Sequence, residues 1–118
     1  MSKWNPENAH KSKTGSLRYN QGKPEMSQLD PEFLLELADM MTEAAKKYGK
    51  HNWKLGQAYS TPYDSCMRHL LAFMSGEDMD KESGKSHILH SVANLMILWY
   101  TWKHCDQELD DRYKEEKK

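Results

Sequence analysis

Apolar residues recur with the 3.6-residue period of an α-helix in three stretches of this chain. We expect helices over residues 31–49 and 61–75, and a third helix from near Ser83 or Ser86 to about residue 109. No stretch alternates between apolar and polar residues over a useful length, as a half-buried strand would. The sequence therefore predicts an all-α fold with three main helices.

Residues that favour helix ends flank the first two stretches. Asp30 and Pro31 form an N-cap and first-turn pair, and Gly49 and Gly76 are stop signals. The positions expected to face the core are 34, 37, 38, 41, 45 and 48 in the first helix, and Met67, Leu70, Leu71 and Met74 in the second.

The third helix is apolar almost all the way round. Its large or branched apolar side chains point in several directions: Val92, Leu95, Met96, Leu98, Trp99 and Trp102. Three helices cover such a surface poorly, so we expect a small helical bundle that assembles as a homo-oligomer. Around it, residues 1–16 are expected to form a flexible segment, residues 17–109 one helical domain, and residues 110–118 a charged, solvated tail.

Composition narrows the classes of protein to consider. The 118 residues suit one domain, and 17 basic against 18 acidic residues argue against bulk nucleic-acid binding. The longest apolar run, residues 95–100, is far shorter than the ~20 residues that span a bilayer, so we expect a cytoplasmic protein without a membrane partner. Cys66 and Cys105 stand alone and are expected to be buried as small hydrophobic residues.

Polar side chains gather in residues 76–94, GEDMDKESGKSHILHSVAN. His87, His90 and Asn94 follow one another at i, i+3 and i+7, so they share one face of the third helix. The carboxylates just before them offer the oxygen ligands that Mg²⁺ prefers: Glu77, Asp78, Asp80 and Glu82. This segment is the predicted functional centre.

Several roles stay open for these residues. His87 and His90 could be metal ligands, a proton relay or hydrogen-bond partners of the acidic loop. Their HxxH spacing lacks the glutamate and the i,i+4 geometry of a zinc-protease helix, so zinc is the minor alternative. Asn94 is expected to hydrogen-bond a ligand or to fix a histidine tautomer. In the plainest interpretation, Asp80 or Ser83 simply caps the third helix.

Outside residues 76–94, several basic side chains could bind the phosphates of a nucleotide, and an aromatic ring could stack on its base. Arg68 and His69 adjoin an apolar helix face, so at least one should point inward or toward the polar stripe. The other residues expected to bind substrate are Arg18, Lys23, Lys47, Tyr48, Asn52 and Trp53. The plainer alternative treats Trp53 as a core anchor beside a solvated helix end. The segment LRYNQGKP lacks the Walker spacing, which excludes a P-loop.

Three motifs taken in order, LRYNQGKP, AAKKYGKHNW and RHLLAFMSGEDMDKESGKSHILHSVANLMIL, resemble a family of small phage and bacterial proteins. These are the dATP/dGTP diphosphohydrolase-like proteins, related to the MazG-type all-α nucleotide pyrophosphatases. The resemblance spans roughly residues 17–100 and makes this stretch a MazG-like nucleotide-binding domain. It implies an oligomeric helical fold, a nucleoside triphosphate substrate and cleavage between the α and β phosphates with Mg²⁺, or with Mn²⁺ in its place.

The chain departs from the MazG-type metal motifs. Those enzymes hold magnesium with ExxE on one helix and ExxD on another, often within an EExGD-like run. Here the first helix has no ExxE, and HSVAN occupies the place of EExGD, with His90 and Asn94 instead of acids. Glu77 and Asp80 do form an ExxD, just before the third helix.

Two hypotheses follow. The first is a Mg²⁺-dependent pyrophosphohydrolase of purine (deoxy)nucleoside triphosphates, with metal ligands Glu36, Glu77, Asp80 and Glu82 and catalytic residues Glu77, Asp80, His87 and His90. The second, favoured by the missing ExxE, is a non-catalytic oligomer that binds or sequesters a nucleotide or a nucleotide-derived signal, such as a phage anti-defence protein. A structural helical oligomer is the third and plainest reading.

Overall fold

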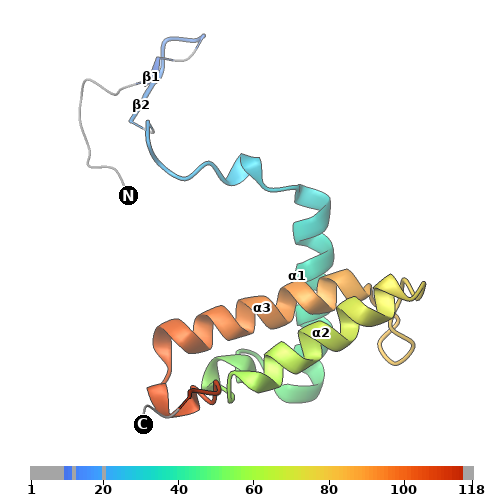
Figure 1. Cartoon of the computed structure of the whole chain (residues 1–118). Helices are drawn as coiled ribbons and strands as arrows, with labels where there is room; N and C mark the ends of the chain where they lie inside the picture. The colour runs from blue at the N-terminus through green and yellow to red at the C-terminus, as the bar shows by residue number, and fades with distance from the viewer. Residues whose placement is uncertain (1–9, 12, 20, 116–118) are drawn as a thin grey trace. The chain divides into compact units, whose positions relative to one another are not determined.

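The chain forms two units, which are described separately. The computed structural model describes residues 10–11, 13–19 and 21–115 (Figure 1). One unit comprises Met1–Pro31 and the other Glu32–Lys118. Residues 1–9 and 12, most of the segment expected to be flexible, lie outside the described residues.

The described part of the N-terminal unit contains a small hairpin. Strand β1 (His10–Lys11) pairs antiparallel with β2 (Leu17–Arg18). A short 3-10 helix, Met26–Gln28, follows. These two-residue strands escaped the sequence analysis because two residues carry no readable alternation.

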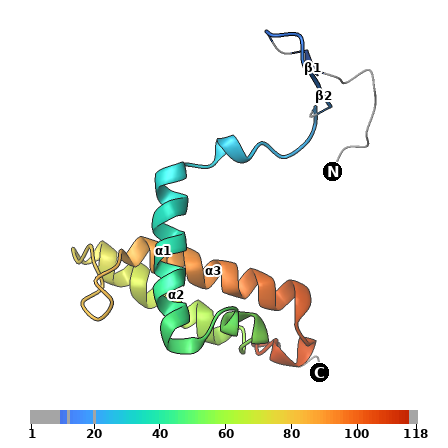
Figure 2. The same cartoon turned by 180° about the vertical axis from the view of Figure 1, so that it is seen from behind.

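The helical unit confirms the all-α prediction. Its helices are α1 (Pro31–Tyr48), α2 (Ser60–Met74) and α3 (His87–His104), with a short 3-10 helix, Asn52–Leu55, between the first two. Helices α2 and α3 run antiparallel and side by side, and α1 crosses this pair (Figures 1 and 2). No helix among the described residues is long and apolar enough to cross a membrane.

A small core joins α1 to α3. Met40 is buried against Leu89 and Ala93, and Phe33, Leu37 and Met41 pack around them. Leu37 and Met41 of the predicted face therefore lie at the core, whereas Leu34 and Tyr48, also expected there, are 40% and 60% exposed. The crossing explains the correction, because a helix that crosses its partner buries one short patch and not a full-length stripe.

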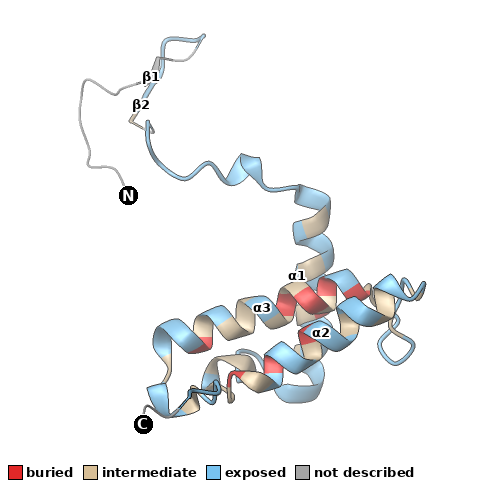
Figure 3. Ribbon diagram, viewed as in Figure 1, coloured by how far each residue is buried: buried red, intermediate tan, exposed pale blue. Residues whose placement is uncertain are grey.

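The apolar stripe predicted on α2 faces away from α3, which corrects the expectation. Met67 and Leu70 are each 37% exposed, Leu71 is 62% exposed and Met74 79% exposed. The buried side of α2 instead carries Pro62 and Cys66 (Figure 3). Small residues let two helices approach closely.

The two cysteines differ in burial. Cys66 is buried and its carbonyl accepts a hydrogen bond of 3.0 Å from the Ser91 Oγ on α3. Cys105 is free like Cys66 but only half-buried, so the expectation of burial is confirmed for the first cysteine alone. Its position just beyond α3, where the chain bends back, leaves one side open.

Helix α3 starts as predicted and stops earlier. The Ser86 Oγ accepts hydrogen bonds from the backbone N–H groups of Ile88 and Leu89, so Ser86 is the N-cap, and Asp80 and Ser83 are not. The helix ends at His104 because Cys105 is extended, with φ −101° and ψ 171°.

Beyond α3 the chain folds back toward the start of α2. The carbonyl of Leu109 accepts a 3.0 Å hydrogen bond from the Tyr59 N–H, and Gly56, at φ +92°, passes close to Leu109 and Cys105. The Asp111 carboxylate also accepts a 2.9 Å hydrogen bond from the Ser60 N–H. The first residues of the expected solvated tail are thus attached to the helical unit.

Candidate functional site: a histidine cluster between α2 and α3

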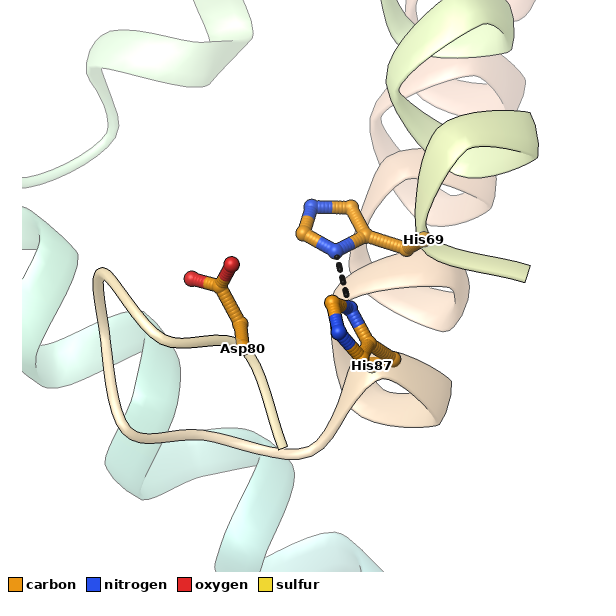
Figure 4. Close-up of side chains that lie close together, drawn as sticks. All are labelled: His69, Asp80 and His87. Carbon is orange, nitrogen blue, oxygen red and sulfur yellow. Dashed lines mark hydrogen bonds between the residues drawn. The ribbon is translucent and has the colours of Figure 1, made fainter. Parts of the chain in front are cut away.

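Three histidines meet where the loop of residues 77–86 joins α2 to α3. His69 comes from α2, and His87 and His90 occupy the first turn of α3. The Nδ1 atoms of His69 and His87 lie 2.8 Å apart, and the rings of His69 and His90 stack with centroids 4.3 Å apart. Figure 4 shows His69, Asp80 and His87 converging from the two helices and the loop. Of Arg68 and His69, the histidine is the one that points inward, as one of them was expected to.

The loop is held in place by its own backbone. Met79 and Ser86 form an antiparallel bridge, and the Asp80 N–H donates to the Lys85 carbonyl at 2.8 Å. Gly84 permits the turn between them with φ +72°. This narrow turn places the Asp80 side chain beside the histidines.

Three contacts connect Asp80, Ser83 and His90. The Ser83 N–H donates to the Asp80 Oδ2 at 2.9 Å, and the Ser83 Oγ lies 2.7 Å from the His90 Nε2. The Asp80 Oδ2 lies 3.8 Å from the same His90 nitrogen. Because serine and aspartate share one ring nitrogen, the three residues do not form a nucleophilic triad, in which they would sit on opposite nitrogens.

Burial and charge set the protonation of this cluster. Burial lowers the pKa of both His69 and His90, and the neighbouring histidine charge lowers that of His69 further. Partial burial would raise the pKa of Asp80, but hydrogen bonds from Ser83 outweigh it and the net shift is downward. At neutral pH the site therefore holds neutral His69 and His90 beside an ionised carboxylate.

His87 is the most enclosed member of the cluster. Its side chain is 5% exposed, and its Nε2 lies 3.3 Å from the Glu77 Oε2. This contact is outside hydrogen-bond geometry, so among the described residues the buried Nε2 has no hydrogen-bond partner. Buried polar atoms are nearly always paired, so an exception indicates a place for a ligand, an ion or water.

The predicted metal ligands Glu36, Glu77, Asp80 and Glu82 lie on α1 and on the loop of residues 77–86. Within the described part of the chain, the group of three or more metal-ligating side chains with donor atoms within 4.8 Å of one another is His69, Asp80 and His87. Glu36 and Glu82 are exposed and belong to no such group. Glu77 faces His87 and Lys81. The carboxylate ligand set stays a prediction, and Asp80 is its member within the converging group.

Asn94 extends the polar stripe toward α2, as its helical position predicted. Its Nδ2 donates to the Ser65 Oγ at 3.1 Å and to the His90 carbonyl at 2.8 Å. The contact to His90 goes to the backbone and not to the ring. Asn94 therefore does not fix the His90 tautomer.

The middle of α1 lies close to the acidic loop. The Lys85 Nζ is 2.8 Å from the Asp39 Oδ2. The pKa of Lys47 is raised, first by its contact with Tyr48 and more weakly by the charge of Glu82. Of the predicted substrate contacts on α1, Lys47 is thus within electrostatic reach of the loop, and Tyr48 is 60% exposed at the end of the helix.

The remaining predicted contacts lie elsewhere. Trp53 packs edge-on against Tyr100, with centroids 5.1 Å apart, which is about 15 Å along α3 from His90. Asn52 adjoins it, so Trp53 acts as an anchor at the far end of the helix pair. Arg68 is exposed on α2 beside His69.

Arg18 and Lys23 are exposed residues of the N-terminal unit, and their binding role stays a prediction.

Other contacts at the site were not predicted from the sequence. Ser83 was considered only as a helix cap, and Ser65 and the Asp39–Lys85 pair had no sequence signal, because they join residues far apart in the chain.

Comparison with known proteins places this region in a family. A family model described as "dATP/dGTP diphosphohydrolase, N-terminal" matches residues 13–112. A dATP/dGTP diphosphohydrolase of Salmonella phage PMBT28 is 32% identical over 84 residues, which cover 71% of this chain and 29% of the relative. The matched stretch is thus less than a third of that relative's length. No solved structure matches the chain.

Proposed function

This chain belongs to the dATP/dGTP diphosphohydrolase N-terminal family, and on that premise we propose that it is a nucleotide pyrophosphohydrolase of purine deoxynucleoside triphosphates. The observation that carries the proposal is the cluster of His69, Asp80, His87 and His90, which lies inside the matched region. A buried, incompletely paired polar cluster indicates a ligand, and the relative's name supplies the substrate class.

The residues of the cluster suit a proton-transfer role in hydrolysis. His90 has a lowered pKa because it is partly buried, so it is neutral near pH 7 and able to accept a proton from an attacking water. The ionised Asp80, 3.8 Å from its Nε2, would stabilise the resulting imidazolium. Lys47 on α1 and Arg68 on α2 are the nearby cations proposed to attract the phosphate chain.

Magnesium is the cofactor that the family resemblance implies, but the described side chains do not form a site for it. Mg²⁺ prefers oxygen ligands, whereas the converging donors are two imidazoles and one carboxylate. We therefore propose Mg²⁺ only as a partner of the substrate, whose phosphates chelate it. The residue roles above do not depend on it.

Self-association is proposed from the exposed apolar side chains. Leu71 and Met74 on α2 are 62% and 79% exposed, and Trp99 and Trp102 on α3 are 54% and 58% exposed. Residues at these helical spacings form stripes that a second copy would cover. Light scattering after size-exclusion chromatography should report an oligomer, and Leu71→Glu should shift it toward monomer.

The activity is tested by incubating the protein with dATP, dGTP, ATP, GTP and pyrimidine triphosphates in the presence of Mg²⁺ or Mn²⁺. We expect each purine deoxynucleoside triphosphate to yield its nucleoside monophosphate and pyrophosphate. In His90→Gln the rate of hydrolysis should fall by at least about 100-fold. His104→Gln, an exposed histidine at the other end of α3, is the matched control and should keep full activity. Absence of product from every triphosphate would contradict the proposal.

The second candidate is a nucleotide-binding oligomer without turnover. It is favoured by the carboxylates that do not converge and by the 29% share of the relative that the match covers. Thermal stabilisation by a purine nucleotide without product, at enzyme-like protein concentrations, would favour binding alone. Neither stabilisation nor product across the panel would leave a structural oligomer.

A further inference from the structure

We propose that His69, Asp80 and His87 form a binding site for one divalent transition-metal ion, of the class that includes Zn²⁺ and Co²⁺. The three residues come from α2, the connecting loop and α3, and their donor atoms lie within 4.8 Å of one another (Figure 4). This site does not depend on the proposed nucleotide chemistry, and it differs from the magnesium site that the sequence predicted.

The spacing of the donors fits a shared ion. Donors bound to Zn²⁺ at about 2.0–2.2 Å in a tetrahedron lie roughly 3.3 Å from one another. The two Nδ1 atoms of His69 and His87 are 2.8 Å apart and face each other. Small side-chain rotations would replace this hydrogen bond by two bonds to one metal, with Asp80 as the third ligand.

The types of donor select the class of ion. Two imidazole nitrogens and one carboxylate oxygen are a common ligand set for Zn²⁺ and for other first-row transition metals, whereas Mg²⁺ prefers oxygen alone. Three protein ligands also leave a coordination position for water or for an oxygen of a bound anion. The site therefore resembles an open metal centre more than a closed structural one.

The surroundings of the three residues supply the outer contacts that metal ligands usually have. If His87 binds through Nδ1, its Nε2 carries the proton and faces the Glu77 carboxylate, whose Oε2 lies 3.3 Å away. Glu77 is thus the acceptor toward which this buried nitrogen, now without a hydrogen-bond partner among the described residues, would donate after a small shift. On the other side, the Ser83 N–H orients the Asp80 carboxylate through its 2.9 Å hydrogen bond.

Electrostatics also favour a cation at this position. His69 stacks on His90 and contacts His87, and the Asp80 carboxylate belongs to the same group of converging side chains. A metal ion bound here would balance the charge of the Asp80 carboxylate. It would also connect α2, the loop and α3, and so stabilise the helix pair.

The test uses the full chain without a histidine tag, stripped of metal with a chelator. Calorimetric titration should detect one Zn²⁺ or Co²⁺ per chain and no comparable binding of Mg²⁺, and Zn²⁺ should raise the Tm. His69→Gln and Asp80→Asn should each weaken Zn²⁺ binding by more than about 100-fold, and Glu77→Gln by roughly 10-fold. His104→Gln should bind like the parent, and circular dichroism should confirm that every variant is folded.

Three outcomes would overturn the site: no binding of Zn²⁺ or Co²⁺ by the parent, equal binding by the folded His69 and Asp80 variants, or thiolate charge-transfer bands in the Co²⁺ spectrum, which would assign the ion to Cys66 or Cys105. No nucleotide is present in these measurements. A protein that binds Zn²⁺ but hydrolyses nothing would contradict the proposed activity alone. One that hydrolyses dATP or dGTP but fails to bind Zn²⁺ would contradict the metal site alone.

Discussion

The two ends of the α2–α3 pair use polar residues in opposite ways. At the histidine end, where the loop connects the helices, His87 is almost fully enclosed and one of its ring nitrogens has no hydrogen-bond partner among the described residues. At the terminal end, where α2 begins and α3 finishes, the Ser60 N–H and Tyr59 N–H donate to Asp111 and Leu109 at 2.9 Å and 3.0 Å.

The two ends differ in what surrounds their polar groups, and this difference indicates which end is structural and which end binds a ligand. At the terminal end Ser60 and Tyr59 are paired with groups of the same chain, and Arg112 lies over the Tyr59 ring at 5.5 Å. The fully buried Thr101 Oγ1 near the end of α3 is the exception, because it has no hydrogen-bond partner among the described residues. The paired groups complete the fold, and the Thr101 hydroxyl is a single neutral group. At the histidine end the pairing is incomplete and the groups are buried, a costly arrangement unless something binds there.

The largest expected effect tests whether the terminal end is structural. Gly56 has φ +92°, and a Cβ there would lie 2.8 Å from the Leu109 Cδ1 and 3.0 Å from the Cys105 Sγ. Gly56→Ala should therefore lower the free energy of unfolding by about 2–4 kcal/mol, measured by urea denaturation.

Gly49→Ala is the matched control for that experiment. Gly49 has φ +91° and open space around it, so only the backbone strain of about 1–2 kcal/mol should appear. Equal losses in the two variants would show that Gly56 makes no close packing contact. Folded Gly56→Ala should still bind Zn²⁺, because the histidines lie at the other end of the pair.

A smaller effect should come from the start of α3 at the histidine end. Ser86→Ala removes the cap that accepts hydrogen bonds from Ile88 and Leu89, at a cost of about 1 kcal/mol in urea denaturation. Ser83→Ala is the control, since its side chain caps no helix and contacts His90 instead. A greater loss of stability in Ser83→Ala would reverse the assignment of the cap.

As the pH falls, the stability contributed by the histidine end should be lost before that contributed by the terminal end. The pKa values of His69 and His90 lie below the ordinary 6.5, so below about pH 6.5 the unfolded chain binds more protons than the native one. Stability is fully present above pH 6.5, and the Tm should fall by a few degrees as the pH drops below it. His69→Gln should flatten this part of the profile in a metal-free thermal melt, and an unchanged slope would exclude His69 as its source.

The smallest effect is expected from the exposed carboxylate of the terminal end. The pKa of Asp111 is lowered, mainly by hydrogen bonds from Ser60, so its contribution is present at neutral pH and lost only in acid, as the pH falls through that lowered value. Asp111→Asn should therefore lower the Tm slightly at pH 7 and leave Zn²⁺ binding unchanged. A change in metal affinity would mean that the two ends are coupled.

Local chemistry made much of the helical framework predictable. The Asp30–Pro31 start, the stops at Gly49 and Gly76 and the Ser86 start depend on residues within a turn of the helix end. The shared face of His87, His90 and Asn94 follows from the helical period alone. Family membership rested on motif order and was confirmed by the match over residues 13–112.

What the sequence by itself determined, then, is where the helices lie and which polar residues share a helix face, because both depend on neighbours along the chain. Only the tertiary structure decided that His87 meets His69 of α2, that the Met74 stripe faces outward, and that the chain leaves α3 at His104. These features depend on how one helix is rotated against another, which no single helix encodes. The convergence of His69, Asp80 and His87 has the same origin, since these residues come from three separate elements.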